Sequence, residues 1–292
     1  MNTTNNSASP RRRAGFRTAF RAKAACLLGA ASLAWLAGCA PMHTTQSGAV
    51  GINRTQYMSS LVPEQQLQAE AASQYTQLIQ QARAQKALNP SAAQTRRVRN
   101  ISQRLIRQVG VFRPDAANWK WEVNVLQSKE VNAWCMPGGK IAVYSGLIQQ
   151  LKATDDELAA VIGHEIAHAL REHARERVSQ QMATGVGLSI LAAVTGSQAT
   201  TDLGGKLSEV MFTLPNSRTH ETEADLMGVE LAARAGYDPR AAVTLWRKMA
   251  ALGGGGQPEF LSTHPSASTR IAELERIAEQ MMPLYRQAGG KR

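Results

Sequence analysis

Residues 164–168 read His-Glu-Ile-Ala-His, so two histidines stand four residues apart with a glutamate beside the first. On a helix, residues four apart share one face at a distance of about 6 Å. His164 and His168 could therefore hold one metal ion, with Glu165 beside the ion but not bound to it. This H-E-x-x-H pattern suggests a zinc site without establishing one by itself.

A second group of acidic residues follows in Glu221-Thr-Glu-Ala-Asp225. Glu221 and Asp225 are also four apart, so their carboxylates face the same side of a helix. One can bind the metal while the other accepts a hydrogen bond from a ligating imidazole, which favours Glu221 over Glu223 as the ligand. The alternatives are core histidines with ordinary partners and a solvated acidic helix face. Together the two motifs favour Zn²⁺, one ion per chain.

The chemistry that follows is metal-assisted hydrolysis of a peptide bond. Two histidines and one glutamate leave a tetrahedral zinc ion with an open position for water. We expect Glu165 to act as general base toward that water and then to protonate the leaving amine. Asp225 is expected to orient a ligand histidine.

Local patterns place these residues on two helices. Thr154 and Glu157 form a capping box, and apolar residues then recur at helical spacing, which predicts a helix over about 155–179. The second helix should begin after Asn216 or Ser217. His173 and His220 flank the ligands without ligand spacing, so we expect them at the surface or behind the ligands.

Two strands are predicted near the first helix, over 119–126 and 141–144, with Pro-Gly-Gly as turn chemistry between them. They predict a small antiparallel sheet beside the H-E-x-x-H helix. We expect an edge within 132–144 to bind substrate in extended form through its backbone, and an ordinary hairpin is the alternative. The residues expected at that edge are Asn132, Ala133, Pro137, Gly138 and Gly139.

The stretch 132–147 resembles the N-A-x-x-x-P-G-G-x-I-x-V-x-x-G-L segment of the HtpX, CAAX prenyl protease and BepA family of gluzincins. Ser217-Arg218 and the Leu-Ser-Thr-His-Pro-Ser segment at 261–266 match later segments of that family, and the resemblance spans about 61–283. The soluble periplasmic lipoprotein branch (BepA-like and LoiP-like) fits best, because no spanning helices flank the motif helix. The resemblance implies a mostly helical α+β zincin-type domain and an endopeptidase that degrades misfolded or misassembled envelope proteins, with outer-membrane assembly machinery as a possible partner.

His264 receives two interpretations. In the periplasmic branch, a histidine in the matching Thr-His-Pro segment can take the fourth zinc position and keep the enzyme latent. Alternatively, His264 belongs to the cap of a helix that starts near Ser266. A latent site would suit a second functional class, a chaperone-like assembly factor, although such a protein has no need of Glu165.

The first 39 residues predict export. A basic segment without acids precedes an apolar run over 24–35, and Leu36-Ala-Gly-Cys39 follows. This is the pattern of a secretory signal, and its end resembles the lipobox of bacterial lipoproteins. We therefore expect residues 1–38 to be removed, Cys39 to be lipidated, and the chain to lie on the periplasmic face of the outer membrane.

The remaining boundaries follow from composition. Residues 39–60, rich in small polar side chains after Cys39, predict a flexible tether. Residues 61–283 predict one metallopeptidase domain, and 284–292 a disordered tail. The formal net charge is +11, and the six basic residues of the signal segment account for about half of it. The mature chain is thus only modestly basic, and we expect no nucleic-acid binding.

Overall fold

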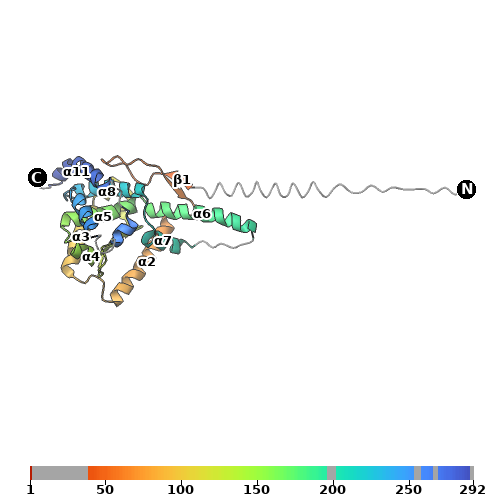
Figure 1. The fold of residues 1–292 in the computed structure, drawn as a ribbon, viewed down its shortest axis with the longest axis horizontal. Coiled ribbons are helices and arrows are strands. Elements are labelled where there is room, and N and C mark those ends of the chain that lie inside the picture. The colour runs from red at the N-terminus through yellow and green to blue at the C-terminus, as the bar shows by residue number, and fades with distance from the viewer. Residues whose placement is uncertain (2–38, 196–201, 253–257, 266–268, 290–292) are drawn as a thin grey trace. The chain divides into compact units, whose positions relative to one another are not determined.

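The computed structural model describes residues 1, 39–195, 202–252, 258–265 and 269–289. The predicted signal peptide therefore lies outside the described residues, apart from Met1. Helices dominate the described part, as predicted for a mostly helical α+β domain (Figure 1). Its helices and strands, in chain order, are β1 (Cys39–Met42), β2 (Gln56–Ser59), α2 (Glu64–Ala84), α3 (Ala92–Ile106), β3 (Glu122–Leu126), β4 (Ala133–Met136), β5 (Lys140–Tyr144), α4 (Ser145–Gln150), α5 (Asp155–Leu170), α6 (His173–Thr195), α7 (Leu203–Phe212), α8 (Arg218–Arg234), α9 (Ala241–Ala251), α10 (Glu259–Thr263) and α11 (Arg270–Gln287).

Helix α5 carries the H-E-x-x-H motif and begins as the sequence predicts. The Thr154 hydroxyl accepts from the Glu157 amide, and the Glu157 carboxylate accepts from the Thr154 amide. The helix ends at Leu170, however, and the predicted continuous helix to 179 is wrong. Glu172 adopts a left-handed conformation (φ 52°), which breaks the helix, and α6 starts at the next residue.

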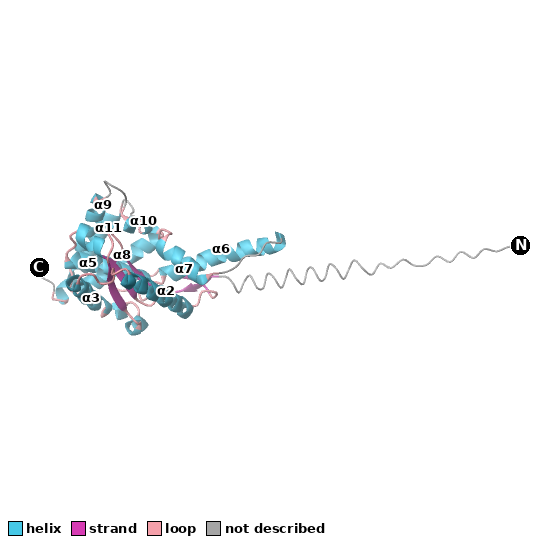
Figure 2. Ribbon diagram, turned by 90° about the horizontal axis from the view of Figure 1, so that it is seen from below, coloured by secondary structure: helices cyan, strands magenta, loops and turns pink. Residues whose placement is uncertain are grey.

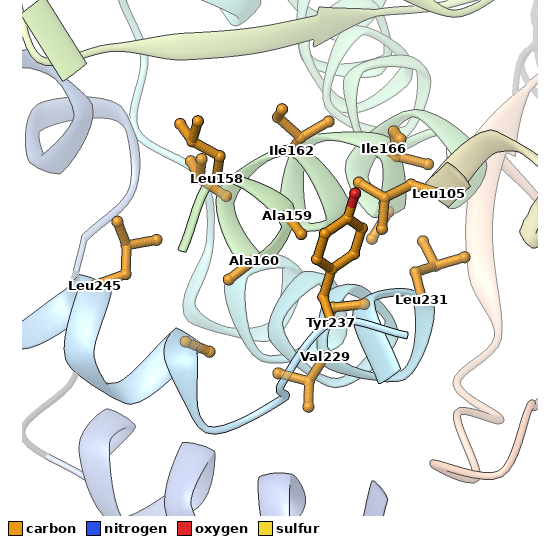
Figure 3. Close-up of a cluster of buried hydrophobic side chains, with 14 of the residues drawn as sticks. Leu105, Leu158, Ala159, Ala160, Ile162, Ile166, Val229, Leu231, Tyr237 and Leu245 are labelled. Carbon is orange, nitrogen blue, oxygen red and sulfur yellow. The ribbon is translucent and has the colours of Figure 1, made fainter. Parts of the chain in front are cut away.

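The apolar faces of several helices meet α5 in one core. Its side chains pack against α8, α9 and α3 (Figure 3). Helices α5 and α8 approach closely because glycines face each other at the contact. A Cβ on Gly228 would lie 2.7 Å from the amide nitrogen of His164, closer than real Cβ contacts allow. The two motif helices are thus held together next to the first motif histidine.

Strands of a small sheet lie beside α5 (Figure 2). This sheet has three strands in the order β3-β5-β4. β4 pairs antiparallel with β5 through a turn whose Gly138 and Gly139 have φ 77° and 84°. β3 runs parallel to β5, so the sheet is mixed and the prediction of an antiparallel sheet is wrong in this respect. The chain between the two predicted strands contains β4, which lies at the edge of the sheet, within the range 132–144 where an edge was expected.

Residues 39–60 do not form the predicted flexible tether. β1 pairs with β2 along its whole length, and Met58 is buried. The carboxylate of Glu230 accepts hydrogen bonds from the amides of Ala49 (3.0 Å) and Val50 (2.9 Å). Polar side chains of the segment bind charged residues as well: Gln56 donates to Glu176 (2.9 Å), and Thr45 accepts from Arg171 (3.2 Å).

The C-terminal end is also more ordered than predicted. Helix α11 continues to Gln287, and Tyr285 is buried, so a disordered tail from 284 is contradicted as far as 287. Within the described ranges, no helix combines the length and the apolar run that are needed to span a membrane.

The Glu176 carboxylate of α6 binds side chains of the N-terminal segment, and these contacts should make the stability of the fold sensitive to acid. Burial raises its pKa, but hydrogen bonds from Arg54, His220 and Gln56 outweigh burial and hold the pKa well below its usual range. Its stabilising effect is therefore complete above the unfolded-state pKa of about 4.3 and is lost as the pH falls toward the lower folded-state value.

We expect Glu176→Gln to lower the free energy of unfolding at pH 7 by about 1–2 kcal/mol, a value reduced for solvent screening because the Arg54 side chain is 30% exposed. Urea unfolding from pH 7 to pH 3.5 should show this difference shrinking below about pH 4. Glu209→Gln, at an exposed position, is the matched control. A difference that stays constant across the range would contradict the prediction.

Candidate metal centre

Four buried side chains from separate parts of the chain converge on one point. His164 and His168 come from α5, Glu221 from α8, and His264 from the residue after α10. One ligand atom of each lies within 4.8 Å of the others. The Nε2 atoms of the first two histidines are 3.1 Å apart, and the Glu221 carboxylate lies 3.3 Å and 3.5 Å from them. Three imidazoles and one carboxylate form a donor set typical of zinc.

The ring of His164 is fixed from behind, as predicted. Its Nδ1 lies 3.0 Å from Oδ1 of Asp225. Arg270 donates both to Asp225 (2.6 Å) and to Glu221 (3.0 Å), and its guanidinium lies 3.3 Å above the ring centroid of Trp246. Sequence reasoning missed Arg270, because a charged residue at the start of α11 gave no sign that it would be buried.

The ring of His168 is fixed by another histidine. Its Nδ1 lies 2.9 Å from Nδ1 of His173, whose Nε2 lies 2.9 Å from the Glu223 carboxylate. His173 and His220 are buried, and their rings stack with centroids 4.3 Å apart. We expected them either at the surface or behind the ligands, and their burial excludes the surface. Glu223 points away from the four-residue cluster, as predicted. Periodicity gave no sign of the break at Glu172 that turns His173 back toward α5.

Glu165 lines a cavity of about 460 Å³ together with His168 and His264 of the cluster. Its Oε1 is buried without a hydrogen-bond partner among the described residues, and the nearest imidazole nitrogen, Nε2 of His264, is 3.5 Å away. Burial raises the pKa of Glu165. A buried carboxylate oxygen without a partner is costly, so its position indicates that a water molecule or a substrate group completes the site.

The electrostatics of the cluster favour a bound cation. Burial alone would raise the pKa of Glu221, but His264, His164 and His168 around it lower that pKa well below its ordinary value. Burial lowers the pKa of His164, yet hydrogen bonds to Asp225 and Glu221 raise it to about 9. Burial also lowers the pKa of His168 well below its ordinary value.

Ring orientation makes the same point. A histidine must be neutral to bind a metal ion, and in neutral His164 the Asp225 carboxylate, an acceptor, places the proton on Nδ1 and leaves a lone pair on Nε2. That lone pair faces the Nε2 of His168 and the Glu221 carboxylate at 3.1–3.5 Å. Acceptors this close repel unless a proton or a metal ion lies between them. The residues therefore fit a metal ion.

The edge strand β4 lines the same cavity. Asn132, Ala133, Pro137 and Gly138 border it together with Glu165, His168 and His264. Gly139 does not line the cavity; a Cβ there would lie 2.6 Å from the ring of Trp121, so this glycine serves close packing in the turn. The structure thus brings four of the five expected strand residues to the candidate site.

His264 faces the cluster. Its Nδ1 lies 3.0 Å from Oε1 of Glu221 and 3.3 Å from Nε2 of His164. Its ring stacks on Phe260 at 4.2 Å. Ser266, the residue of the alternative helix cap, lies outside the described residues. The fourth-ligand interpretation therefore has the geometry that it requires.

Residues 92–278 match Peptidase family M48. The chain belongs to this family. Among its relatives, the mitochondrial metalloendopeptidase OMA1 of Arabidopsis thaliana is 40% identical over 169 residues, which cover 57% of this chain and 34% of the relative. The OMA1 protein of Schizosaccharomyces pombe is 41% identical over 162 residues (53% and 46%). The beta-barrel assembly-enhancing protease of Escherichia coli is 33% identical over 178 residues (56% and 36%).

Membership of family M48 confirms the metallopeptidase class that the sequence predicted. The matches cover between a third and a half of the length of these relatives. Both mitochondrial and bacterial members match, so the comparisons do not single out the periplasmic lipoprotein branch. Membership also implies a catalytic metal, in agreement with the four-residue cluster.

Proposed function

We propose that this M48 chain is an endopeptidase with one zinc ion per chain, held by His164, His168 and Glu221. One observation carries the proposal: these ligand atoms converge within 4.8 Å, beside the unpartnered Oε1 of Glu165 in a cavity. The names of the relatives, metalloendopeptidase and protease, support it. Degradation of casein by residues 40–292, with zinc quantified in the same sample, tests the proposal, and a zinc-loaded chain that cleaves nothing contradicts it.

The protein residues divide the work of hydrolysis. Bound zinc supplies Lewis acidity, which polarises a substrate carbonyl and makes water at the site more acidic. Glu165 accepts a proton from water at its free Oε1 and then donates it to the leaving amine nitrogen. Asp225 holds the ring of His164 in place, and Arg270 holds Asp225.

Strand β4 offers the means to hold a substrate. Among the described residues it pairs with β5 on one side, and its other side borders the cavity. An extended peptide can add to such an edge through backbone hydrogen bonds, which favours broad specificity. Unfolded or misassembled proteins present peptide in this form, and we propose them as substrates.

The proposed location is the periplasmic face of the outer membrane, with a lipid on Cys39. The Leu-Ala-Gly-Cys sequence at 36–39 supports it, as does the E. coli relative, named for β-barrel assembly. Outer-membrane assembly machinery is the corresponding candidate partner. Mass spectrometry of the chain purified from a Gram-negative envelope should find an N-terminus at Cys39 carrying acyl chains. An unmodified Cys39 or an uncleaved N-terminus would exclude the anchor.

We also propose that His264 acts as a latch, since it reaches the cluster from a different segment than the other three ligands. A fourth protein ligand closes the position that water needs. His264→Ala should therefore raise casein cleavage severalfold at equal zinc content. Ser262→Ala, two residues away and exposed, is the control. An inactive or unchanged His264→Ala protein would exclude the latch.

A further inference from the structure

Both α5 histidines of the cluster are supported from behind, but by different means. His164 contacts a carboxylate directly, whereas His168 contacts His173, which in turn contacts Glu223. We propose that His173 and Glu223 are positioning residues for the metal ligand His168, and that Arg54 of the N-terminal segment holds Glu223 in place. The inference rests on the proposed zinc site and identifies residues that tune its affinity.

The contacts admit one consistent arrangement of protons. With Nε2 of His168 facing the metal position, its proton lies on Nδ1 and is donated to Nδ1 of His173 over 2.9 Å. His173 then carries its own proton on Nε2 and donates it to the Glu223 carboxylate, also over 2.9 Å. A hydrogen bond of this kind fixes the ring orientation and the tautomer of a ligand, and it raises the basicity of the metal-facing nitrogen.

Two arginines hold the Glu223 carboxylate. Arg171 donates to it at 2.9 and 3.1 Å, and Arg54 at 2.7 and 3.1 Å. Arg54 also pairs with Glu176 at 2.7 Å. Bidentate pairs of this type favour the ionised carboxylate and fix its orientation, so Glu223 has little freedom to turn away from His173.

The N-terminal segment thereby contributes to the metal site. Arg54 lies between β1 and β2, far from α5 and α8 along the chain, yet three hydrogen-bonded steps link it to a metal ligand. The contact of this segment with Glu230, whose carboxylate accepts hydrogen bonds from the amides of Ala49 and Val50 and from Arg234, has no hydrogen bond to the four-residue cluster within the described ranges. Comparison of this contact with the Arg54 contact therefore separates docking of the segment from support of His168.

Zinc affinity, measured by competition with a chromophoric chelator, tests the inference. Loss of a contact behind a ligand typically weakens metal binding 10- to 100-fold. We expect that loss in His173→Leu, and a smaller one in His173→Asn, whose side-chain oxygen can still accept from His168. The visible spectrum of the Co²⁺-loaded protein should change in the leucine variant and remain near the wild type in the asparagine variant.

Arg54→Gln and Arg234→Gln form the matched pair for the N-terminal contact. The two arginines have similar exposure, 30% and 25% of the side chain, and each binds a buried glutamate. Arg54→Gln should weaken zinc binding severalfold, whereas Arg234→Gln should lower stability without changing zinc affinity. Because Arg54 is partly exposed, this pair remains informative if a His173 variant fails to fold. Equal zinc affinity in folded Arg54→Gln and wild type, or in His173→Leu and wild type, would overturn the inference.

These outcomes are separable from those that test the enzyme. If the wild-type chain binds zinc but cleaves no peptide, the proposed function is wrong. The zinc affinities of the wild type and of the His173 and Arg54 variants would still test the role of these residues. If the wild type cleaves peptide and all variants bind zinc with equal affinity, the proposed function is supported, and the positioning role of His173, Glu223 and Arg54 is wrong.

Discussion

Replacing Glu165 with glutamine should lower the rate of peptide hydrolysis by roughly 10²- to 10⁴-fold while leaving zinc bound, because proton transfer by a positioned side chain contributes about that much. Glutamine keeps the size of the side chain but cannot accept the proton of water at Oε1. Since Glu165 is not a predicted ligand, one zinc ion per chain should remain. Initial rates on casein, beside zinc content by elemental mass spectrometry, measure both quantities.

Glu279→Gln makes the same chemical change at an exposed position of α11 and should leave both quantities unchanged. Cleavage at the wild-type rate by Glu165→Gln would show that another group is the base. If the wild type and Glu165→Gln both bind zinc and neither cleaves casein, the chaperone-like alternative would be favoured, and His264 would be the next residue to test. Rescue of an envelope defect by Glu165→Gln would favour that alternative as well.

The second large effect is expected for His164→Ala, which should lose stoichiometric zinc and activity together. The substitution removes one of the three proposed zinc ligands and leaves Asp225 and Arg270 without the ring that they orient. We expect the dissociation constant for zinc to rise by more than about 100-fold, because loss of a contact behind a ligand alone gives 10- to 100-fold.

Zinc retained after dialysis measures this effect, with His43→Ala, an exposed histidine, as the control. Circular dichroism on the same samples separates loss of metal from loss of fold. A folded His164→Ala protein that keeps one zinc ion per chain would place the metal site elsewhere.

The parts of the site that sequence could predict are those governed by local spacing. His164 and His168, like Glu221 and Asp225, converge because residues four apart share a helix face, and the Thr154–Glu157 capping box is a local hydrogen-bond pattern. These features need no knowledge of the rest of the chain.

The missed parts depend on tertiary contacts. The carboxylate of Glu172, the residue with the left-handed backbone, pairs with Arg175 nearby and with Arg113, which is distant in sequence and is brought there by folding. The burial of Arg270 and His173 likewise depends on partners that are distant in sequence. The flexible tether predicted for residues 39–60 was wrong for the same reason. Composition shows that the segment is polar, but it does not show the buried charged residues that bind it.

If Cys39 carries the proposed lipid, the folded N-terminal segment would limit how far the catalytic domain can lie from the membrane. A free coil of the 21 residues 40–60 would give a root-mean-square reach of about 25 Å. Instead, β1 begins at Cys39 and is paired with β2, so no slack chain separates a lipid on that residue from the body of the domain. With such an anchor, the enzyme would work at the bilayer surface, and a substrate would have to approach the membrane to be cut.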